Sequence, residues 1–255
     1  MIKTFSLAGA VALSLVTTMA VAQDGRFAAS FGGPSAMASP DGLATIAATY
    51  ADPRGGIKGS DADGEIGVTY SFGSAVRNVS VTVGASITGT TKPFGDAGSF
   101  TLNASRLVHV SEKSLTFVGA SASGLGSWGP NAASRADRKA QVAVTNTGVI
   151  GAGEIPYIAS IGYGQDVVWD SKTTTATTGQ LKDGASYAFG LGVIPNVSLG
   201  ISGTETQTNA GVVVGLPFAP GVSIAAGVYD VGGRVHREQK SITIGYGIDT
   251  KGLFK

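Results

Sequence analysis

The amino-acid sequence predicts an all-β protein: a closed antiparallel transmembrane β-barrel of about 12 strands, arranged as an up-and-down meander. Three observations predict this fold. Apolar residues alternate with small or polar residues through most of the chain, the links between these segments are short and long in turn, and the charged residues lie in the links. Lipid-facing and lumen-facing residues alternate along the strands of such barrels, so one fold accounts for all three.

The first 22 residues have the features of a secretory signal peptide. Lys3 supplies a positive charge, residues 5–16 are largely apolar, and the small residues Ala20 and Ala22 precede Gln23. This order is typical of a cleaved export signal. We therefore expect residues 1–22 to be removed and the mature chain to reach the bacterial outer membrane.

Composition narrows the possible functions. Without the signal, 17 basic residues balance 17 acidic ones, so the chain shows no attraction for nucleic acid. The sequence has no cysteine, which excludes a lipid anchor, a disulfide and a thiolate metal site. Charged residues make up only 14% of the chain, and no apolar run of about 20 residues follows the signal. We expect no cofactor and no metal.

Twelve segments show an alternation with a period of two, which predicts strands. The last segment is the clearest, because Ile242, Ile244, Tyr246 and Ile248 alternate with small or polar residues. The twelve predicted strands cover residues 44–50, 66–72, 79–88, 100–110, 115–121, 140–150, 157–163, 187–193, 197–201, 212–216, 222–228 and 242–248. An even number of strands is usual in bacterial barrels.

The links between these segments sort by length. The short ones cover residues 73–78, 111–114, 151–156, 195–196 and 217–221, and the clearly long ones cover 51–63, 123–138, 165–184 and 230–240. Short turns at one end and long loops at the other are typical of outer-membrane barrels.

The position of the charges decides which face meets which solvent. Soluble sheets carry charges on their outer face, whereas here the face opposite the apolar residues is glycine, serine and threonine. We therefore expect residues 42–255 to form a barrel with its apolar face in lipid. The predicted lumen-lining residues are Glu65, Thr69, Ser71, Thr82, Ser86, Ser198, Ser202, Thr243 and Asp249, with the two acidic residues near opposite mouths. A secreted soluble β-sandwich is an alternative.

Two local features remain open at this stage. Aromatic residues near strand ends fit girdles at the membrane interfaces: Tyr50, Phe100, Tyr157, Tyr187 and Tyr229. Arg106 shares the parity of Phe100 and therefore faces lipid, unless a bulge near Ser105 reverses the alternation.

Residues 23–41 precede the first predicted strand. They include Phe27, Phe31 and Met37. This segment is predicted to be either a plug that folds into the lumen or a flexible periplasmic leader, and an extra strand is a third possibility.

The C-terminal row of Ile242, Ile244, Tyr246, Ile248 and Phe254 keeps one parity and ends in an aromatic residue, followed by Lys255. It resembles the assembly signal of bacterial outer-membrane β-barrel proteins. The resemblance implies that the barrel-insertion machinery binds this row during assembly, and that outer-membrane lipid and lipopolysaccharide surround the finished barrel. The competing interpretation is a frayed chain end.

These features favour a pore over an enzyme. His109 and His236 are the only histidines, and neither stands in a recognised Ser–His motif. Asp61, Asp63 and Glu65 resemble only a fragment of a calcium loop. Because small side chains do not fill a barrel of about twelve strands, we predict a weakly selective passive pore for small neutral solutes. The alternative is a structural or surface-interaction barrel that acts through its long extracellular loops.

Overall fold

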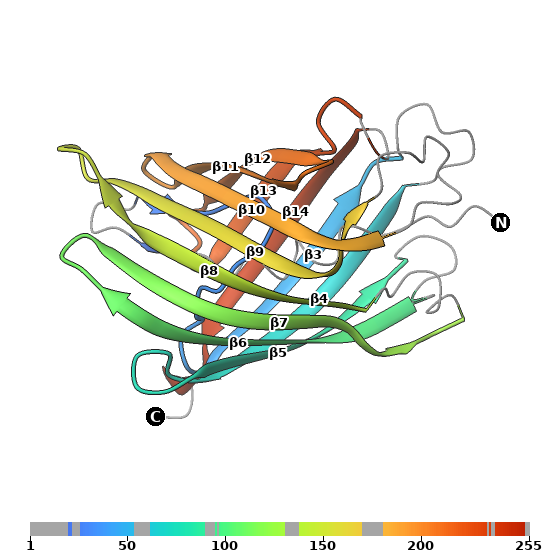
Figure 1. Ribbon diagram of the computed structural model, residues 1–255, viewed down its shortest axis with the longest axis horizontal. Coiled ribbons are helices and arrows are strands. Elements are labelled where there is room, and N and C mark those ends of the chain that lie inside the picture. Colours follow the sequence, from blue (N-terminus) through green and yellow to red (C-terminus); the bar gives the residue numbers. More distant parts are fainter. Residues whose placement is uncertain are drawn as a thin grey trace.

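A computed structural model describes residues 20–21, 26–53, 62–89, 95, 97–130, 138–169, 181–233, 235 and 238–252. Twelve antiparallel strands, β3 to β14, form a closed barrel in which each strand pairs with its neighbours in sequence (Figure 1). The ring closes where β14 pairs with β3, from Ser241 opposite Ala51 to Asp249 opposite Leu43. This closure confirms the predicted meander and excludes the β-sandwich.

The barrel strands have the following bounds: β3 Leu43–Ala51, β4 Asp63–Gly73, β5 Ser80–Thr88, β6 Ala97–Val110, β7 Ser114–Trp128, β8 Lys139–Ile150, β9 Ile155–Trp169, β10 Leu181–Ile194, β11 Val197–Thr204, β12 Thr208–Gly215, β13 Val222–Tyr229 and β14 Gln239–Asp249. Two short strands, β1 Ala20–Val21 and β2 Phe27–Ala28, pair with each other outside this ring order. A 3₁₀ turn, η1 Thr250–Gly252, follows β14.

Each predicted segment corresponds to one barrel strand, but several strands are longer than their apolar pattern. The prediction for β7 stops at residue 121, whereas the strand continues to Trp128. Gly124 and Gly126 have positive φ angles of 68° and 52°, and the register with β6 shifts in this region. Irregular pairing of this kind breaks the alternation that defines a strand in sequence.

The two faces of the sheet differ as predicted. On β14, Ile242, Ile244 and Tyr246 are exposed on the outside, whereas Ser241 and Thr243 between them are buried. Exposed apolar side chains occur around the ring: Ile46, Val68, Tyr70, Phe100, Leu102, Val142, Ile161, Tyr163, Leu199 and Ile201. A surface of this kind requires lipid, because apolar area in water is unfavourable.

The inner face is held together by hydroxyl pairs between neighbouring strands. Thr49 and Thr243 Oγ1 atoms lie 2.8 Å apart across β3 and β14, and Ser71 Oγ lies 2.8 Å from Thr82 Oγ1 across β4 and β5. A further pair, Thr145 and Ser160, joins β8 to β9 at 2.8 Å. These bonds satisfy polar groups that the barrel encloses.

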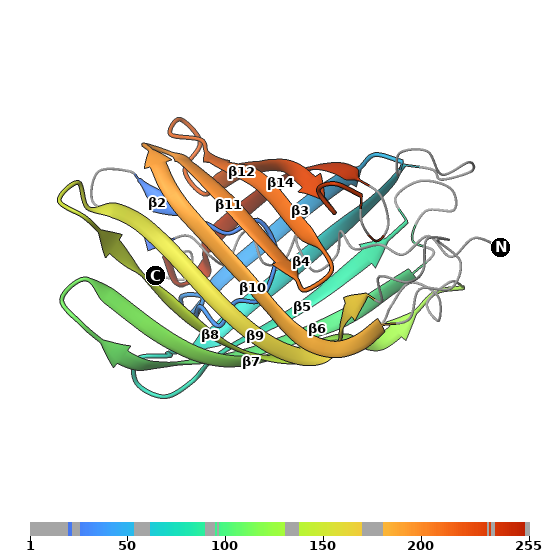
Figure 2. The ribbon, with the colours of Figure 1, turned by 45° about the horizontal axis from the view of Figure 1, so that its top comes forward.

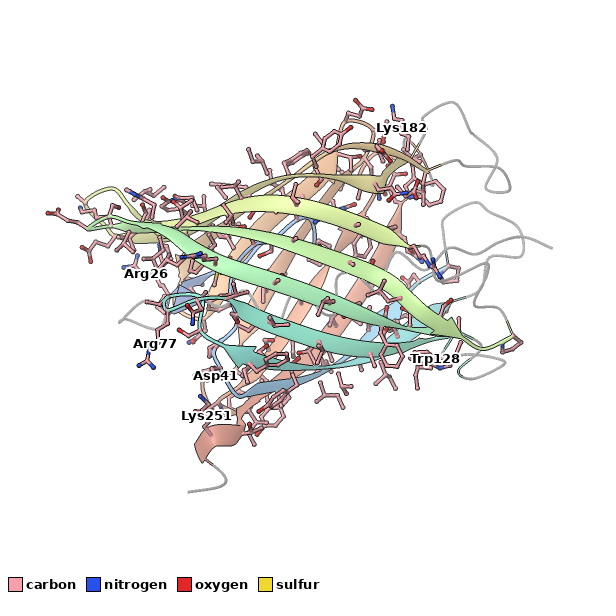
Figure 3. All side chains as sticks on the ribbon, turned by 60° about the horizontal axis from the view of Figure 1, so that its bottom comes forward. Arg26, Asp41, Arg77, Trp128, Lys182 and Lys251 are labelled. Atoms are coloured by element: carbon pink, nitrogen blue, oxygen red, sulfur yellow. The ribbon has the colours of Figure 1, made fainter. Side chains whose placement is uncertain are left out.

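The barrel has two distinct ends. We call the end with the links 74–79, 111–113, 151–154, 195–196 and 216–221 the short-turn end, and the opposite one the long-loop end. Strand β3 starts and η1 ends at the short-turn end, where Figure 3 shows Asp41, Arg77 and Lys251. Trp128 and Lys182 lie at the long-loop end in the same view. No helix within the described ranges is long and apolar enough to span a membrane.

The structure corrects the expectation for Tyr229 and decides between the two alternatives for Arg106. Tyr229 is not part of an outer girdle: it is 1% exposed and faces the lumen. Its parity requires this, because Val228 is on the outer face. Arg106 is exposed on the outside, paired with Val118, and the neighbouring Ser105 is buried. The register shift in this part of β6 lies at Leu107 to His109, so no bulge near Ser105 reverses Arg106.

Candidate functional site, the barrel lumen

Residues 26–42 lie inside the barrel, and we call them the inner segment (Figure 2). Its first part follows the wall formed by β10 to β13. The Ala29 amide donates a hydrogen bond to Ser198 Oγ at 2.8 Å, and Ser202 Oγ donates to the Phe31 carbonyl at 2.6 Å. Serine side chains of β11 therefore bind the backbone of the inner segment.

The second part of the inner segment contacts the opposite wall. The Ala36 amide donates to Thr145 Oγ1 of β8 at 2.7 Å, and the Ser105 hydroxyl of β6 donates to the Ala36 carbonyl. Ser80 Oγ of β5 then donates to the Ser39 carbonyl at 2.9 Å. The segment thus crosses the lumen from β11 to β8 and returns along β6 and β5 to the start of β3.

The Phe31 ring occupies a socket made by two glycines. Phe31 is 1% exposed. A Cβ added at Gly211 would lie 2.4 Å from the Phe31 ring, and one added at Gly227 would lie 2.5 Å from it. Tyr229 covers the ring, with the two ring centroids 5.3 Å apart. Only glycine at these positions of β12 and β13 leaves space for the aromatic ring.

Glycines also allow the backbone of the inner segment to approach the wall. A Cβ at Gly190 would lie 2.2 Å from the Ala29 oxygen, one at Gly192 would lie 2.4 Å from the Phe27 oxygen, and one at Gly200 would lie 2.5 Å from the Phe31 nitrogen. The inward glycines on β10 and β11, which in the sequence indicate an empty lumen, here make room for the inner segment.

The inner segment turns at two glycines. Gly32 and Gly33 have φ angles of 73° and 81°, a region that side chains with a Cβ rarely occupy. A Cβ at Gly33 would also lie 2.7 Å from the Ser202 Cβ. Backbone conformation and close packing therefore both require glycine at this point.

The predicted lumen residues occupy different places. Glu65, Ser71, Ser198 and Ser202 are fully buried, Thr69, Ser86 and Thr243 are nearly so, and Thr82 is half-buried. Asp249 is exposed at the short-turn end, where its Oδ1 accepts a hydrogen bond from the Lys251 amide at 2.9 Å. Of this set, Ser198 and Ser202 bind the inner segment through their side chains, and the Ser71 carbonyl accepts a hydrogen bond from the Gly42 amide at 2.8 Å.

A cavity of about 240 Å³ lies between the inner segment and the long-loop end, and we call it the vestibule. Gly33, Pro34 and Ser35 of the inner segment contribute to its lining. Lys139 begins β8 and Trp169 ends β9, which places the other side of the vestibule at the long-loop end. The sequence-predicted Thr69 and Thr82 also line it.

The sequence prediction did not include several vestibule residues, although the alternation along their strands places them in the lumen. Asn103 lies between the exposed Leu102 and the outward Ala104, and Gln141 precedes the exposed Val142. Ser186 and Asn209 also line the cavity. The alternation of outward apolar residues predicts that these polar residues face the lumen. They are hard to recognise because the alternation in their strands is weak.

Other chemistry in the described part of the chain is sparse. His109 is exposed near the short-turn end of β6, and His236 lies outside the described residues, as does Asp61 of the calcium-loop fragment. Within the described ranges, no three histidine, aspartate or glutamate residues are grouped so that they could hold a metal ion.

The predicted assembly row is only partly visible. Ile242, Ile244 and Tyr246 lie exposed on the outer face of β14, and Ile248 is half-exposed. Phe254 lies outside the described residues. The strand ends at Asp249, and the Thr250 amide donates to the Gly42 carbonyl at 2.9 Å. The role of Phe254 in assembly stays a prediction.

Comparison with solved structures gives matches among bacterial membrane channels. The NanC porin aligns with a TM-score of 0.50 at 9% identity, over 79% of this chain and 97% of that one. The chain has the fold of a bacterial outer-membrane β-barrel. The KdgM porin, solved in complex with disordered oligogalacturonate, aligns with a TM-score of 0.47 at 7% identity over 80% of this chain and 98% of that one. Omp33 of Acinetobacter baumannii aligns with a TM-score of 0.45 at 9% identity over 81% and 97% of the two chains.

At these identities the similarity concerns the fold alone. No protein-family model matches the sequence, and no curated protein matches it. The evidence for the function of this outer-membrane β-barrel therefore lies in its own lumen.

Proposed function

We propose that the protein is a weakly selective passive pore for small neutral solutes, and that the inner segment restricts its opening. The observation that carries the proposal is the combination of a closed twelve-stranded wall with a polar lumen that only the inner segment crosses among the described residues. A barrel with more than eight strands is wider than side chains alone fill.

The same features place the protein in the outer membrane in this proposal. An outward apolar face needs lipid, and a closed ring leaves no strand edge unpaired within it. Residues 1–22 would direct export and be cleaved, and the C-terminal row would be bound by the insertion machinery. The short-turn end would then face the periplasm, and the long loops would face outward into lipopolysaccharide.

The vestibule supports weak ion selectivity. Its described lining consists mainly of threonine, serine, asparagine and glutamine, and Lys139 is the ionisable residue among them. A few charges in a wide polar lumen give a small preference between cations and anions, because water screens them strongly.

The inner segment is suited to restricting the pore without supporting the wall. All twelve strands pair with their neighbours independently of it. Its contacts with the strands include a few hydrogen bonds with side chains: Ser198 Oγ accepts one from the Ala29 amide and donates one to the Ala29 carbonyl, Ser202 donates one and Thr145 accepts one. The segment can therefore leave the wall while the ladder of backbone hydrogen bonds stays closed.

Planar-bilayer recordings test the proposal. Wild type should give small conductance steps, and deletion of residues 24–40 should enlarge them because the crossing segment is removed. A mobility difference between unheated and boiled samples in a detergent gel would show that both proteins are folded. Equal conductance would refute the restriction by the inner segment. A folded barrel that gives no steps in either form would refute the pore and favour the surface-interaction alternative.

A further inference from the structure

The vestibule has the chemistry of a binding site, not only of a passage. At about 240 Å³ it is smaller than the roughly 300–1,000 Å³ of pockets that hold drug-sized ligands. Its size therefore limits an occupant to a small molecule. The inner segment contributes part of the lining, so the site depends on the inner segment being in place.

Two buried polar atoms in the lining point to a ligand. Ser186 is 8% exposed, and among the described residues its Oγ has no hydrogen-bond partner. The Oδ1 atom of Asn103 is buried, and no described group is hydrogen-bonded to it. Both residues line the vestibule. Buried polar atoms are almost always paired, so these two are suited to a solute that both donates and accepts hydrogen bonds.

The remaining lining specifies the class of solute. Amide side chains of Gln141 and Asn209 lie beside hydroxyl side chains of Thr82 and Thr101. Trp169 adds an aromatic surface. No described residue of the lining is acidic. A ring with many hydroxyl groups and apolar C–H faces satisfies both the amides and the indole. A cation would meet no acidic residue of the described lining and an anion would meet one basic residue, Lys139, so a charged solute would lose more hydration than the lining replaces.

We propose that the vestibule binds a small uncharged polyhydroxylated solute of monosaccharide size, with Asn103 and Ser186 hydrogen-bonding its hydroxyl groups and Trp169 packing against its ring. The inference rests on the proposed pore, for which it names the class of solute.

Tryptophan fluorescence measures this binding without any recording of transport. The chain has two tryptophans, and Trp128 packs on Phe100 with ring centroids 5.0 Å apart. A Trp128→Phe variant leaves Trp169 as the only reporter. In the folded, detergent-solubilised barrel, glucose should change its emission saturably, and gluconate should bind no more tightly than glucose. Tighter binding of gluconate would assign the site to anions and overturn the proposal.

A pair of matched variants separates the site from general effects. Asn103→Leu in this background should weaken glucose binding about tenfold, the usual effect of losing one neutral hydrogen bond in a site. Asn146→Leu is the control, because Asn146 lies half-buried on the outward row of β8, where it hydrogen-bonds to the Thr116 and Tyr157 side chains and does not line the vestibule. Equal binding in both variants would overturn the assignment.

The binding experiment and the conductance experiment test the two proposals separately. Conductance steps without saturable glucose binding would refute the binding site and remain consistent with the pore. Glucose binding by a barrel that shows no conductance would refute the pore and remain consistent with the binding site.

Discussion

Replacing Phe31 with alanine should release the inner segment from the wall. The Phe31 ring lies in the socket between Gly211 and Gly227, beneath Tyr229, and it belongs to an apolar cluster with Phe27, Val213 and Ala225. Alanine removes the whole ring and leaves the glycine socket empty. The hydrogen bonds that join the Ala29 backbone to Ser198 Oγ, and the Phe31 carbonyl to Ser202 Oγ, remain possible.

The size of the effect follows from the burial of the ring. Truncating a buried phenylalanine to alanine costs about 3–5 kcal/mol, because transfer and cavity terms add. At about 1.4 kcal/mol per factor of ten, the ratio of docked to undocked segment should fall by roughly two to three and a half orders of magnitude. The twelve-strand ladder does not include Phe31, so the barrel should still fold.

Single-channel recording provides the assay. The variant should show larger or more frequent openings than wild type, and its unheated and boiled forms should still differ in gel mobility. Gly215→Ala is the matched control, since its Cβ would lie 3.5 Å from the Phe27 ring, an ordinary contact. A Phe31→Ala barrel that is folded and opens no more than this control would refute the reasoning.

Three further predictions test other parts of the account. Gly33→Ala should also increase conductance, because both its positive φ and the 2.7 Å approach to the Ser202 Cβ exclude a side chain; unchanged recordings would mean that the turn is not needed for docking. The Lys251 side chain hydrogen-bonds Asp41 and lowers the pKa of that carboxyl below its ordinary value of 3.8. This contact therefore stabilises the folded state at pH values above the pKa of Asp41 in the unfolded chain. The stabilisation is lost as the pH falls through the lower pKa of the folded state. The protection of the Gly73 amide from hydrogen exchange, measured relative to its intrinsic rate, should therefore fall at acid pH, because this amide donates to Asp41 Oδ1 at 3.1 Å. Lys251→Met should move that fall in protection to higher pH; an identical pH profile of protection would contradict it. Phe254→Ala should reduce the folded outer-membrane fraction, whereas deletion of Lys255 should not; equal yields from the two would favour a frayed chain end.

The strands were predictable because each separates two solvents. Lipid outside and a polar lumen inside impose the alternation seen at Ile242, Thr243 and Ile244, so its period and parity are visible in the sequence. The same parity places Tyr229 in the lumen, and its assignment to a girdle was wrong because closeness to a strand end was given more weight than alternation.

The path of the inner segment was less predictable. Gly211 and Gly227 are compatible with an open lumen, because a glycine does not reveal which atom uses the space that its missing Cβ leaves. The docking partner, Phe31, is about 180 residues or more from both in sequence, and no periodic pattern relates them. From the sequence, Phe27 and Phe31 indicated a plug only as one of three alternatives for this segment.

An engineered disulfide tests the central claim, that the inner segment crosses the lumen and limits the pore. The chain has no cysteine, so Ala36→Cys with Thr145→Cys introduces the only thiols, at positions where the Ala36 amide lies 2.7 Å from Thr145 Oγ1. Placed in the Phe31→Ala background, this pair should form a disulfide that suppresses the added conductance, and a reductant should restore it. Failure of the pair to cross-link in the folded barrel, or a cross-linked barrel that conducts as freely as the reduced one, would contradict the account.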